Sequence, residues 1–268
     1  MNTIKNLILD MDGVLWHGDT PLPGLVEFFA QLRRKKINFV LATNNATKTA
    51  VMYTEKLANF GVDVPPAQIL TSAETTAVYL SERYDKGTAV YVVGEKGLHE
   101  ALTAKGFHII TPEQARNGIT VPLVVAGFNR YVTYNELAMG ALLVNKGAAF
   151  IGTNPDPSFP SELGPLPGAG SLLAVITTAT GVEPTIIGKP QPIIFQEAVK
   201  RLGGSNDNTA MVGDRLTTDI AGGHAAGLKT ILLLSGVTTA EQAQHSPIQP
   251  DYTFANISEL ANHLADNS

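Results

Sequence analysis

Short apolar runs rich in valine, isoleucine and leucine recur along the chain, and stretches with apolar residues at helical spacing lie between them. The runs show no alternation of apolar and polar residues, which is typical of strands buried on both faces of a parallel sheet. The predicted strands are residues 6–10, 37–42, 68–70, 89–93, 123–126, 149–151, 185–187, 209–212 and 229–234.

Amphipathic segments separate these strands. Thr133 and Glu136 have the spacing of a capping box at the start of one segment, and Thr238 with Glu241 fits a second box further along. The predicted helices are residues 25–35, 48–60, 134–145, 192–202 and 218–226. Buried strands that alternate with helices predict an α/β fold with a parallel sheet and helices on both faces.

The composition is that of a globular protein. Of the 268 residues, 44% are apolar and 16% charged, which excludes a disordered chain. The formal net charge of −5 argues against nucleic acid or anionic lipid as a partner. The lack of cysteine excludes disulfides and zinc–thiolate sites. Without a membrane-length apolar run or a signal-peptide pattern, we expect a soluble cytoplasmic protein with no membrane partner.

Two acidic residues, Asp10 and Asp12, follow the first predicted strand, and Gly13 permits a sharp turn after them. Residues two apart in an extended segment point the same way, so we expect both carboxylates at the sheet edge where ligands bind. Two carboxylates this close repel each other unless a cation lies between them or one of them carries a proton. Both remedies suit phosphate chemistry, because Mg²⁺ binds carboxylate oxygens together with a substrate phosphate and a protonated acid can protonate a leaving group. An EF-hand calcium loop is excluded by Val14 and Pro21 at its fifth and twelfth positions. A plain turn stays open.

A hydroxyl and two amides, those of Thr43, Asn44 and Asn45, follow the second predicted strand. They could bind an anion together with the N–H groups of the next helix. Alternatively, Asn45 or Thr47 could merely cap that helix.

Two further strand ends carry charged residues. Lys189 lies in a Gly-Lys-Pro stretch without the spacing of a phosphate-binding P-loop, but a lysine fixed at the sheet edge could neutralise carboxylates and a phosphoryl oxygen. Asp214 follows another strand, and Asp219 comes five residues later. The alternative is that one of these aspartates is an acidic cap at a helix N-terminus, where the helix dipole favours a negative charge.

The stretch 151–170 is dense in proline and glycine and is long for a plain connection. We therefore expect a functional loop there, with a rigid surface crossover as the alternative. The histidines show no metal-site spacing, and no nucleophilic serine motif occurs.

Together, the four strand ends resemble the motifs of the haloacid dehalogenase (HAD) superfamily of phosphatases. The segment from Asp10 to Val14 resembles the first motif, Thr43-Asn44 the second, Lys189 the third, and Asp214 with Asp219 the fourth. The longer forms DMDGVLW, TNN, GKPQP and VGDRLTTDI are similar to the branch that contains NagD, 4-nitrophenylphosphatase and pyridoxal phosphate phosphatase.

The resemblance implies a Rossmann-like core, residues 1–80 and 185–268, with an inserted α/β cap over residues 81–184. Caps of this branch carry specificity residues, which places the stretch 153–160 at the substrate. Its implied substrate-binding residues are Asn154, Asp156 and Phe159. Phe159 stands where related pyridoxal phosphate phosphatases tend to have histidine, which argues against a vitamin B6 substrate. Relatives often dimerise through the cap, so the resemblance also raises the expectation of a homodimer.

The resemblance also implies a mechanism. Asp10 attacks phosphorus and becomes an aspartyl-phosphate, while Asp12 protonates the leaving oxygen and then deprotonates the hydrolytic water. Mg²⁺ is held by the Asp10 carboxylate, the Asp12 backbone carbonyl and Asp214, with Asp219 supporting the metal's water shell or Lys189. The residues implied to hold the phosphoryl group or the substrate are Thr43, Asn44, Asn45 and Lys189.

The expected function is Mg²⁺-dependent hydrolysis of small phosphomonoesters of the nucleotide, sugar phosphate or phosphoglycolate type. Dehalogenases of this superfamily lack the pairing of Asp10 with Asp12, and its mutases usually have smaller helical caps. The alternative from another class is a non-catalytic regulatory protein that binds a phosphorylated ligand. A nucleophile beside an acid argues against that alternative, because a pure binder needs neither.

Overall fold

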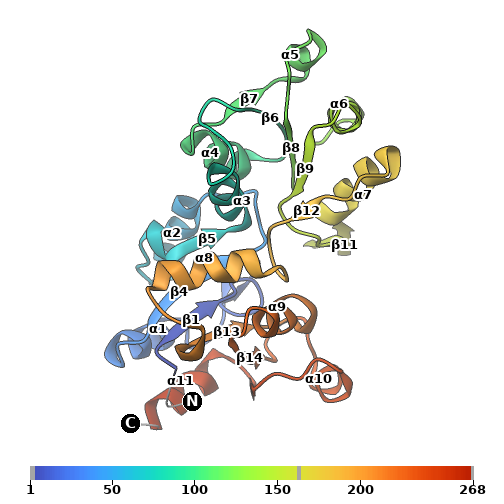
Figure 1. Ribbon diagram of the computed structural model, residues 1–268. Helices are drawn as coiled ribbons and strands as arrows, with labels where there is room; N and C mark the ends of the chain where they lie inside the picture. The colour runs from blue at the N-terminus through green and yellow to red at the C-terminus, as the bar shows by residue number, and fades with distance from the viewer. Residues whose placement is uncertain (1–3, 162–163, 267–268) are drawn as a thin grey trace. The chain divides into compact units, whose positions relative to one another are not determined.

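The computed structural model describes residues 4–161 and 164–266, and the chain separates into two compact units (Figure 1). The first unit comprises residues 1–43, 50–70 and 189–268, and the second comprises residues 44–49 and 71–188. Each unit contains its own parallel sheet with helices, which confirms the predicted α/β class. The predicted division into core and cap stays a prediction. The second unit includes α3 (Ser72–Ser81), of which that division assigns residues 72–80 to the core.

The first unit is built on a six-stranded sheet in the order β15-β14-β13-β1-β4-β5. The central strand β1 pairs in parallel with β4 on one side and β13 on the other. Strands therefore lie on both sides of β1, which makes β1 the switch point of the strand order. Open α/β sheets bind ligands at such a point. The strands are β1 (Asn6–Leu9), β4 (Asn38–Thr43), β5 (Ile69–Thr71), β13 (Thr209–Gly213), β14 (Lys229–Leu233) and β15 (Tyr252–Phe254).

Helices cover both faces of this sheet because successive strand residues face opposite sides and most of them are apolar and buried. Leu7 and Leu9 belong to a core with the apolar residues of α1, α2 and α11. Ile8 belongs to a separate core with α8, which crosses in front of β1 and β4 in Figure 1. These helices are α1 (Leu25–Arg34), α2 (Ala50–Asn59), α8 (Pro192–Leu202) and α11 (Ile257–Asp266).

Short elements complete the first unit. A hairpin of β2 (Trp16–His17) and β3 (Thr20–Pro21) follows β1, and its strands are antiparallel. A π-helical turn, Leu216–Ile220, leads into α9 (Ala221–Ala225). The remaining elements are α10 (Ala240–His245) and the 3₁₀ turns Pro66–Gln68 and Asn206–Asn208.

The second unit has a five-stranded parallel sheet in the order β12-β9-β8-β6-β7. Helices α6 and α7 pack on each other and share a core with β6, β8 and β9. The strands are β6 (Ala89–Val93), β7 (His108–Ile110), β8 (Leu123–Ala126), β9 (Ala149–Gly152) and β12 (Thr185–Ile186), and the helices besides α3 are α4 (Lys96–Ala104), α5 (Pro112–Arg116), α6 (Tyr134–Asn145) and α7 (Ala169–Thr180).

All predicted strands are confirmed within two residues at each end, and α6 and α8 have the predicted bounds. The capping box of Thr133 and Glu136 is confirmed. The second predicted box was wrong by one residue, because Thr239 rather than Thr238 caps α10 and Gln242 completes the box. None of the helices within the described ranges has the length and apolar character needed to cross a membrane.

The stretch 151–170 is not a plain loop. It contains an antiparallel hairpin of β10 (Ser158–Ser161) and β11 (Gly164–Pro167), in which Phe159 lies opposite Leu166. Proline in both strands concealed the hairpin from pattern analysis, since proline within an apolar run argues against a strand.

Candidate active site

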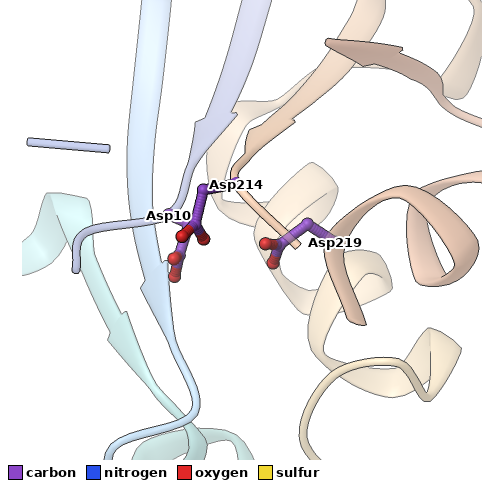
Figure 2. Close-up of side chains that lie close together, drawn as sticks. All are labelled: Asp10, Asp214 and Asp219. Atoms are coloured by element: carbon purple, nitrogen blue, oxygen red, sulfur yellow. The ribbon is translucent and has the colours of Figure 1, made fainter. Parts of the chain in front are cut away.

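Asp10 and Asp214 lie at the carboxyl ends of neighbouring parallel strands. Asp10 directly follows β1 and donates its backbone N–H to the carbonyl of Val212 on β13 at 2.9 Å, while Asp214 directly follows β13. Asp219 joins them from the π-helical turn Leu216–Ile220. Carboxylate oxygens of the three aspartates lie within 4.8 Å of one another (Figure 2). The strand order thus gathers acids that are some 200 residues apart in sequence, and we call them the acidic cluster.

The acidic cluster is buried, with relative exposures of 8% for Asp10, 1% for Asp214 and 0% for Asp219. Burial raises the pKa of Asp214 to about 6, the charge of Asp219 adds to the shift, and the backbone N–H of Val237 opposes it. Burial likewise raises the pKa of Asp10 well above its ordinary value, against the effect of the nearby Lys189 charge. The cluster therefore needs positive charge if all its members are to stay ionised.

Lys189 supplies part of that charge. Its Nζ lies 2.6 Å from Asp10 Oδ1 and 2.7 Å from Asp219 Oδ1. Burial alone would lower the pKa of Lys189, but the charges of Asp10 and Asp219 raise it above its usual value, so the side chain stays protonated. One ammonium against three carboxylates leaves a net negative site that attracts a further cation.

The surroundings of Asp214 leave one of its oxygens available. Asp214 Oδ2 accepts a hydrogen bond from the backbone N–H of Val237 at 2.7 Å. Asp214 Oδ1 is buried and has no hydrogen-bond partner among the residues that the structure describes. A buried carboxylate oxygen without a partner is costly, and a metal ion would satisfy it. Side chains at Gly13 and Gly236 would collide with this carboxylate, so glycine keeps room for it at both positions.

The residues present fit a hard divalent cation, since the acidic cluster offers only oxygen ligands, one of them otherwise unsatisfied. The sequence-based ligand set named Asp10, Asp12 and Asp214, with Asp219 behind them. The structure groups the carboxylate of Asp219 with Asp10 and Asp214, and the Asp12 carboxylate is not in this group of described residues.

Asp12 differs from Asp10 in its environment. Asp12 is exposed to solvent, whereas Asp10 is buried. Its Oδ1 accepts a hydrogen bond of 2.8 Å from Nε1 of Trp16, which begins the β2–β3 hairpin. The two acids therefore have different partners, Lys189 for Asp10 and Trp16 for Asp12.

Thr43 ends β4, the strand beside β1, and is buried. It belongs to the first unit, together with Asp10, Asp12, Lys189, Asp214 and Asp219. Apart from Lys189, these predicted residues lie at the carboxyl ends of the six-stranded sheet or on the segments that follow them. Lys189 follows β12 of the five-stranded sheet instead, and its contacts with Asp10 and Asp219 bring its side chain to the acidic cluster.

The other predicted residues belong to the second unit, where three of them form a hydrogen-bonded group. Asn154 Nδ2 donates to the backbone carbonyl of Asn44 at 2.7 Å, and Asn44 Nδ2 donates to Asp156 Oδ2 at 3.1 Å. Asn45 Oδ1 accepts a hydrogen bond from the backbone N–H of Thr47 in a local turn. Phe159 stacks on Phe128 with ring centroids 4.7 Å apart.

Pattern analysis missed Trp16, the donor to Asp12, and Val237, whose N–H holds Asp214. The only tryptophan of the chain, four residues after an acid, is the one signal in the sequence for the first contact. Nothing in the sequence signals the second, because it depends on a backbone group in a loop after β14.

Two sequence models of known families match the chain. The model described as haloacid dehalogenase-like hydrolase matches residues 7–108, and a HAD-hydrolase-like model matches residues 186–260. An acid sugar phosphatase of Staphylococcus aureus (strain USA300) is 41% identical over 98% of this chain and 99% of that protein.

Solved structures of phosphatases are also similar to this chain. The 4-nitrophenylphosphatase of Thermotoga maritima is 39% identical with a TM-score of 0.91, covering 97% of both chains. NagD of E. coli K-12 is 36% identical with a TM-score of 0.87, covering 96% of this chain and 98% of that one. Glycerol phosphate phosphatase of Mycobacterium tuberculosis, solved in complex with magnesium, is 33% identical with a TM-score of 0.88, covering 96% and 76%.

These matches and the acidic cluster at the switch point of the sheet together identify the class of the protein as a HAD-type hydrolase. The chain belongs to the haloacid dehalogenase-like hydrolases, in the phosphatase branch that includes NagD and 4-nitrophenylphosphatase. The resemblance read from the four strand ends is confirmed.

Proposed function

We propose that this protein hydrolyses small phosphomonoesters, sugar and polyol phosphates above all, through an aspartyl-phosphate on Asp10 with Mg²⁺ in the acidic cluster. The observation that carries the proposal is the buried Asp10, paired with Lys189 and lying beside the unsatisfied Oδ1 of Asp214. The relatives named acid sugar phosphatase and glycerol phosphate phosphatase support this substrate class, and the latter was solved with magnesium.

The proposed chemistry assigns each residue of the first unit a task. Asp10 is the nucleophile, and its pairing with Lys189 orients the carboxylate and favours its ionised form against the effect of burial. Lys189 and Thr43 hold the oxygens of the transferring phosphoryl group, where positioning and charge neutralisation do most of the work of catalysis. Asp12 serves as acid and then as base, a task that suits an exposed carboxyl beside the buried nucleophile.

The bound metal ion would neutralise phosphoryl charge when it is present. Asp10 and Asp214 would hold it with carboxylate oxygens and Asp12 with its backbone carbonyl, while Asp219 orients Lys189. Asn44 and Asn45 are proposed to contribute substrate contacts from the second unit.

We propose that residues 81–184 act as a cap that sets specificity through Asn154, Asp156 and Phe159. Their support is the local order of this segment, in which Asn154 and Asp156 fix Asn44 and Phe159 is held by Phe128. A cytoplasmic location and a homodimer through the cap stay predictions from the sequence.

The test measures phosphate release from 4-nitrophenyl phosphate and from a panel of sugar, polyol and nucleotide phosphates, with Mg²⁺ and with a chelator. Asp10→Asn is the matched variant, because it keeps the shape of the side chain and removes the nucleophile. We expect Mg²⁺-dependent turnover in the wild type and none in the variant. Stabilisation by panel compounds without any turnover would instead support the regulatory binding protein.

A further inference from the structure

The indole of Trp16 is the partner of the Asp12 carboxyl. Trp16 Nε1 lies 2.8 Å from Asp12 Oδ1, and the two residues also form an isolated β-bridge. The backbone N–H of Gly13 donates to the carbonyl of Trp16 at 2.8 Å, which closes the segment between them. The contact therefore joins the first motif to the β2–β3 hairpin through both backbone and side chain.

Trp16 itself is fixed from several sides. It is fully buried, it stacks on Tyr53 with centroids 6.3 Å apart, and it meets Phe60 at 6.0 Å. Lys56 Nζ lies 4.7 Å above the ring and also reaches Gly18 and Asp19 in the turn of the β2–β3 hairpin. A ring held in this way presents its N–H in one direction.

This arrangement matters because Asp12 is exposed. An exposed aspartate ordinarily samples several rotamers, and a hydrogen bond from a rigid donor removes that freedom. Donation to Oδ1 also leaves Oδ2 as the oxygen that carries a transferable proton.

We infer that Trp16 is a positioning residue, which holds Asp12 so that Oδ2 serves as the acid and base of phosphoryl transfer. The inference rests on the proposed function. In the first half-reaction, an Asp10 oxygen bonds to phosphorus, the bond from phosphorus to the ester oxygen breaks, and that oxygen takes the electron pair and the proton of Asp12 Oδ2. In the second, water bonds to phosphorus, the Asp10–phosphorus bond breaks, and the water's proton goes to Asp12 Oδ2.

A tryptophan that served only for packing would lower activity on every substrate alike. A tryptophan that positions the acid matters most where the leaving group depends on protonation. The readout is therefore kcat/KM across substituted phenyl phosphates, from 4-nitrophenyl phosphate, whose phenolate leaves readily, to unsubstituted phenyl phosphate. These probes share the phenyl phosphate scaffold, and each variant is compared with the wild type on the same probes, so binding differences between the probes largely cancel.

The test variant is Trp16→Phe, which keeps an aromatic ring and removes the N–H. We expect the ratio of kcat/KM for 4-nitrophenyl phosphate to that for phenyl phosphate to rise about threefold to tenfold. In Asp12→Asn the ratio should rise as well, and adding Trp16→Phe to it should cause no further rise, because the two residues act as one unit. The matched control Phe60→Leu loosens the same aromatic group without touching the N–H and should leave the ratio unchanged.

A second replacement guards against misfolding of the phenylalanine variant. Trp16 is the only tryptophan, so growing the protein with β-(3-benzothienyl)alanine exchanges this one indole N–H for sulfur and leaves the ring shape intact. The same rise in the ratio is expected. An unchanged ratio in this protein, or a further rise in the double variant, overturns the inference while the proposed function stands. A wild type that hydrolyses none of the phenyl phosphates overturns the proposed function, and the inference with it.

Discussion

Lys189 Nζ lies 2.7 Å from Asp219 Oδ1, and both side chains are buried, at 4% and 0% relative exposure. The same ammonium lies 2.6 Å from Asp10 Oδ1, so Asp219 holds the lysine from one side while Asp10 meets it from the other. A second hydrogen bond, from the backbone N–H of Arg215 to Asp219 Oδ2 at 3.1 Å, fixes Asp219 in turn. This chain of contacts orients the proposed nucleophile through a residue of the π-helical turn.

Replacing Lys189 by methionine should therefore cost both stability and activity. The variant leaves buried carboxylates without their cation, which typically costs about 3–5 kcal/mol, and we expect turnover to fall by about 10²–10³. Thermal unfolding and phosphate release measure the two effects. Lys229→Met is the matched control, because Lys229 also pairs with an aspartate at 2.7 Å, but at the surface, and its loss should change little. Equal losses of stability and turnover in the two variants would contradict the buried ion pair as the source of those losses.

The raised pKa of Asp214 predicts how metal-free stability depends on pH. A carboxyl whose pKa is about 6 in the folded protein and 3.8 in the unfolded chain binds its proton more tightly when folded. The contribution of this group to stability is therefore fully present below about pH 4 and is lost as the pH rises through about 6, a fall of about 3 kcal/mol. Chemical denaturation in chelator across this range measures the fall. Asp214→Asn should reduce the fall, and so should saturating Mg²⁺, because a bound cation favours the ionised carboxylate.

Much of the fold could be predicted because the strands of the first unit are short, apolar on both faces and bounded by turn residues. Leu7, Ile8 and Leu9 show this well, since each is fully buried although they alternate between two cores. Pattern analysis failed where a strand is short and carries polar residues. The strand β7, His108–Ile110, begins with an exposed histidine and is held by its pairing with β6 rather than by its own pattern.

The part of the candidate site that could be predicted consists of polar and charged residues that directly follow a predicted strand. Asp10 and Asp214 each follow a buried strand, and neighbouring parallel strands bring such positions to one edge. Lys189 follows the short strand β12 of the five-stranded sheet, so its place beside Asp10 does not follow from the strand order. The place of Asp219 at this site was implied by the family resemblance and not by the local pattern, because it depends on a π-helical turn that a helical pattern over 218–226 does not reveal. The Trp16–Asp12 contact likewise requires a hairpin whose strands are only two residues long.

The two proposed tasks of Asp12 predict a burst in Asp12→Asn. With 4-nitrophenyl phosphate, loss of the acid slows the first half-reaction little, because 4-nitrophenolate leaves readily. Loss of the base slows hydrolysis of the aspartyl-phosphate by about 10²–10⁴. Stopped-flow absorbance should therefore show one equivalent of 4-nitrophenol per enzyme before a slow steady state, and acid-quenched protein should carry phosphate on Asp10. Slow release without a burst would show that Asp12 is not the base of the second half-reaction.

Phe159 should set substrate preference rather than metal dependence. It is partly exposed in the β10–β11 hairpin and stacks on Phe128, a contact worth about 0.5–1.5 kcal/mol in similar pairs. Phe159→Ala removes an apolar surface from the proposed cap, so we expect KM values for different phosphomonoesters to shift by unequal factors while the Mg²⁺ requirement stays the same. Tyr134→Ala is the matched control, since Tyr134 is an aromatic residue of the same unit with 85% relative exposure. A uniform loss of kcat on every ester, with unchanged KM ratios, would assign Phe159 to the packing of the hairpin instead.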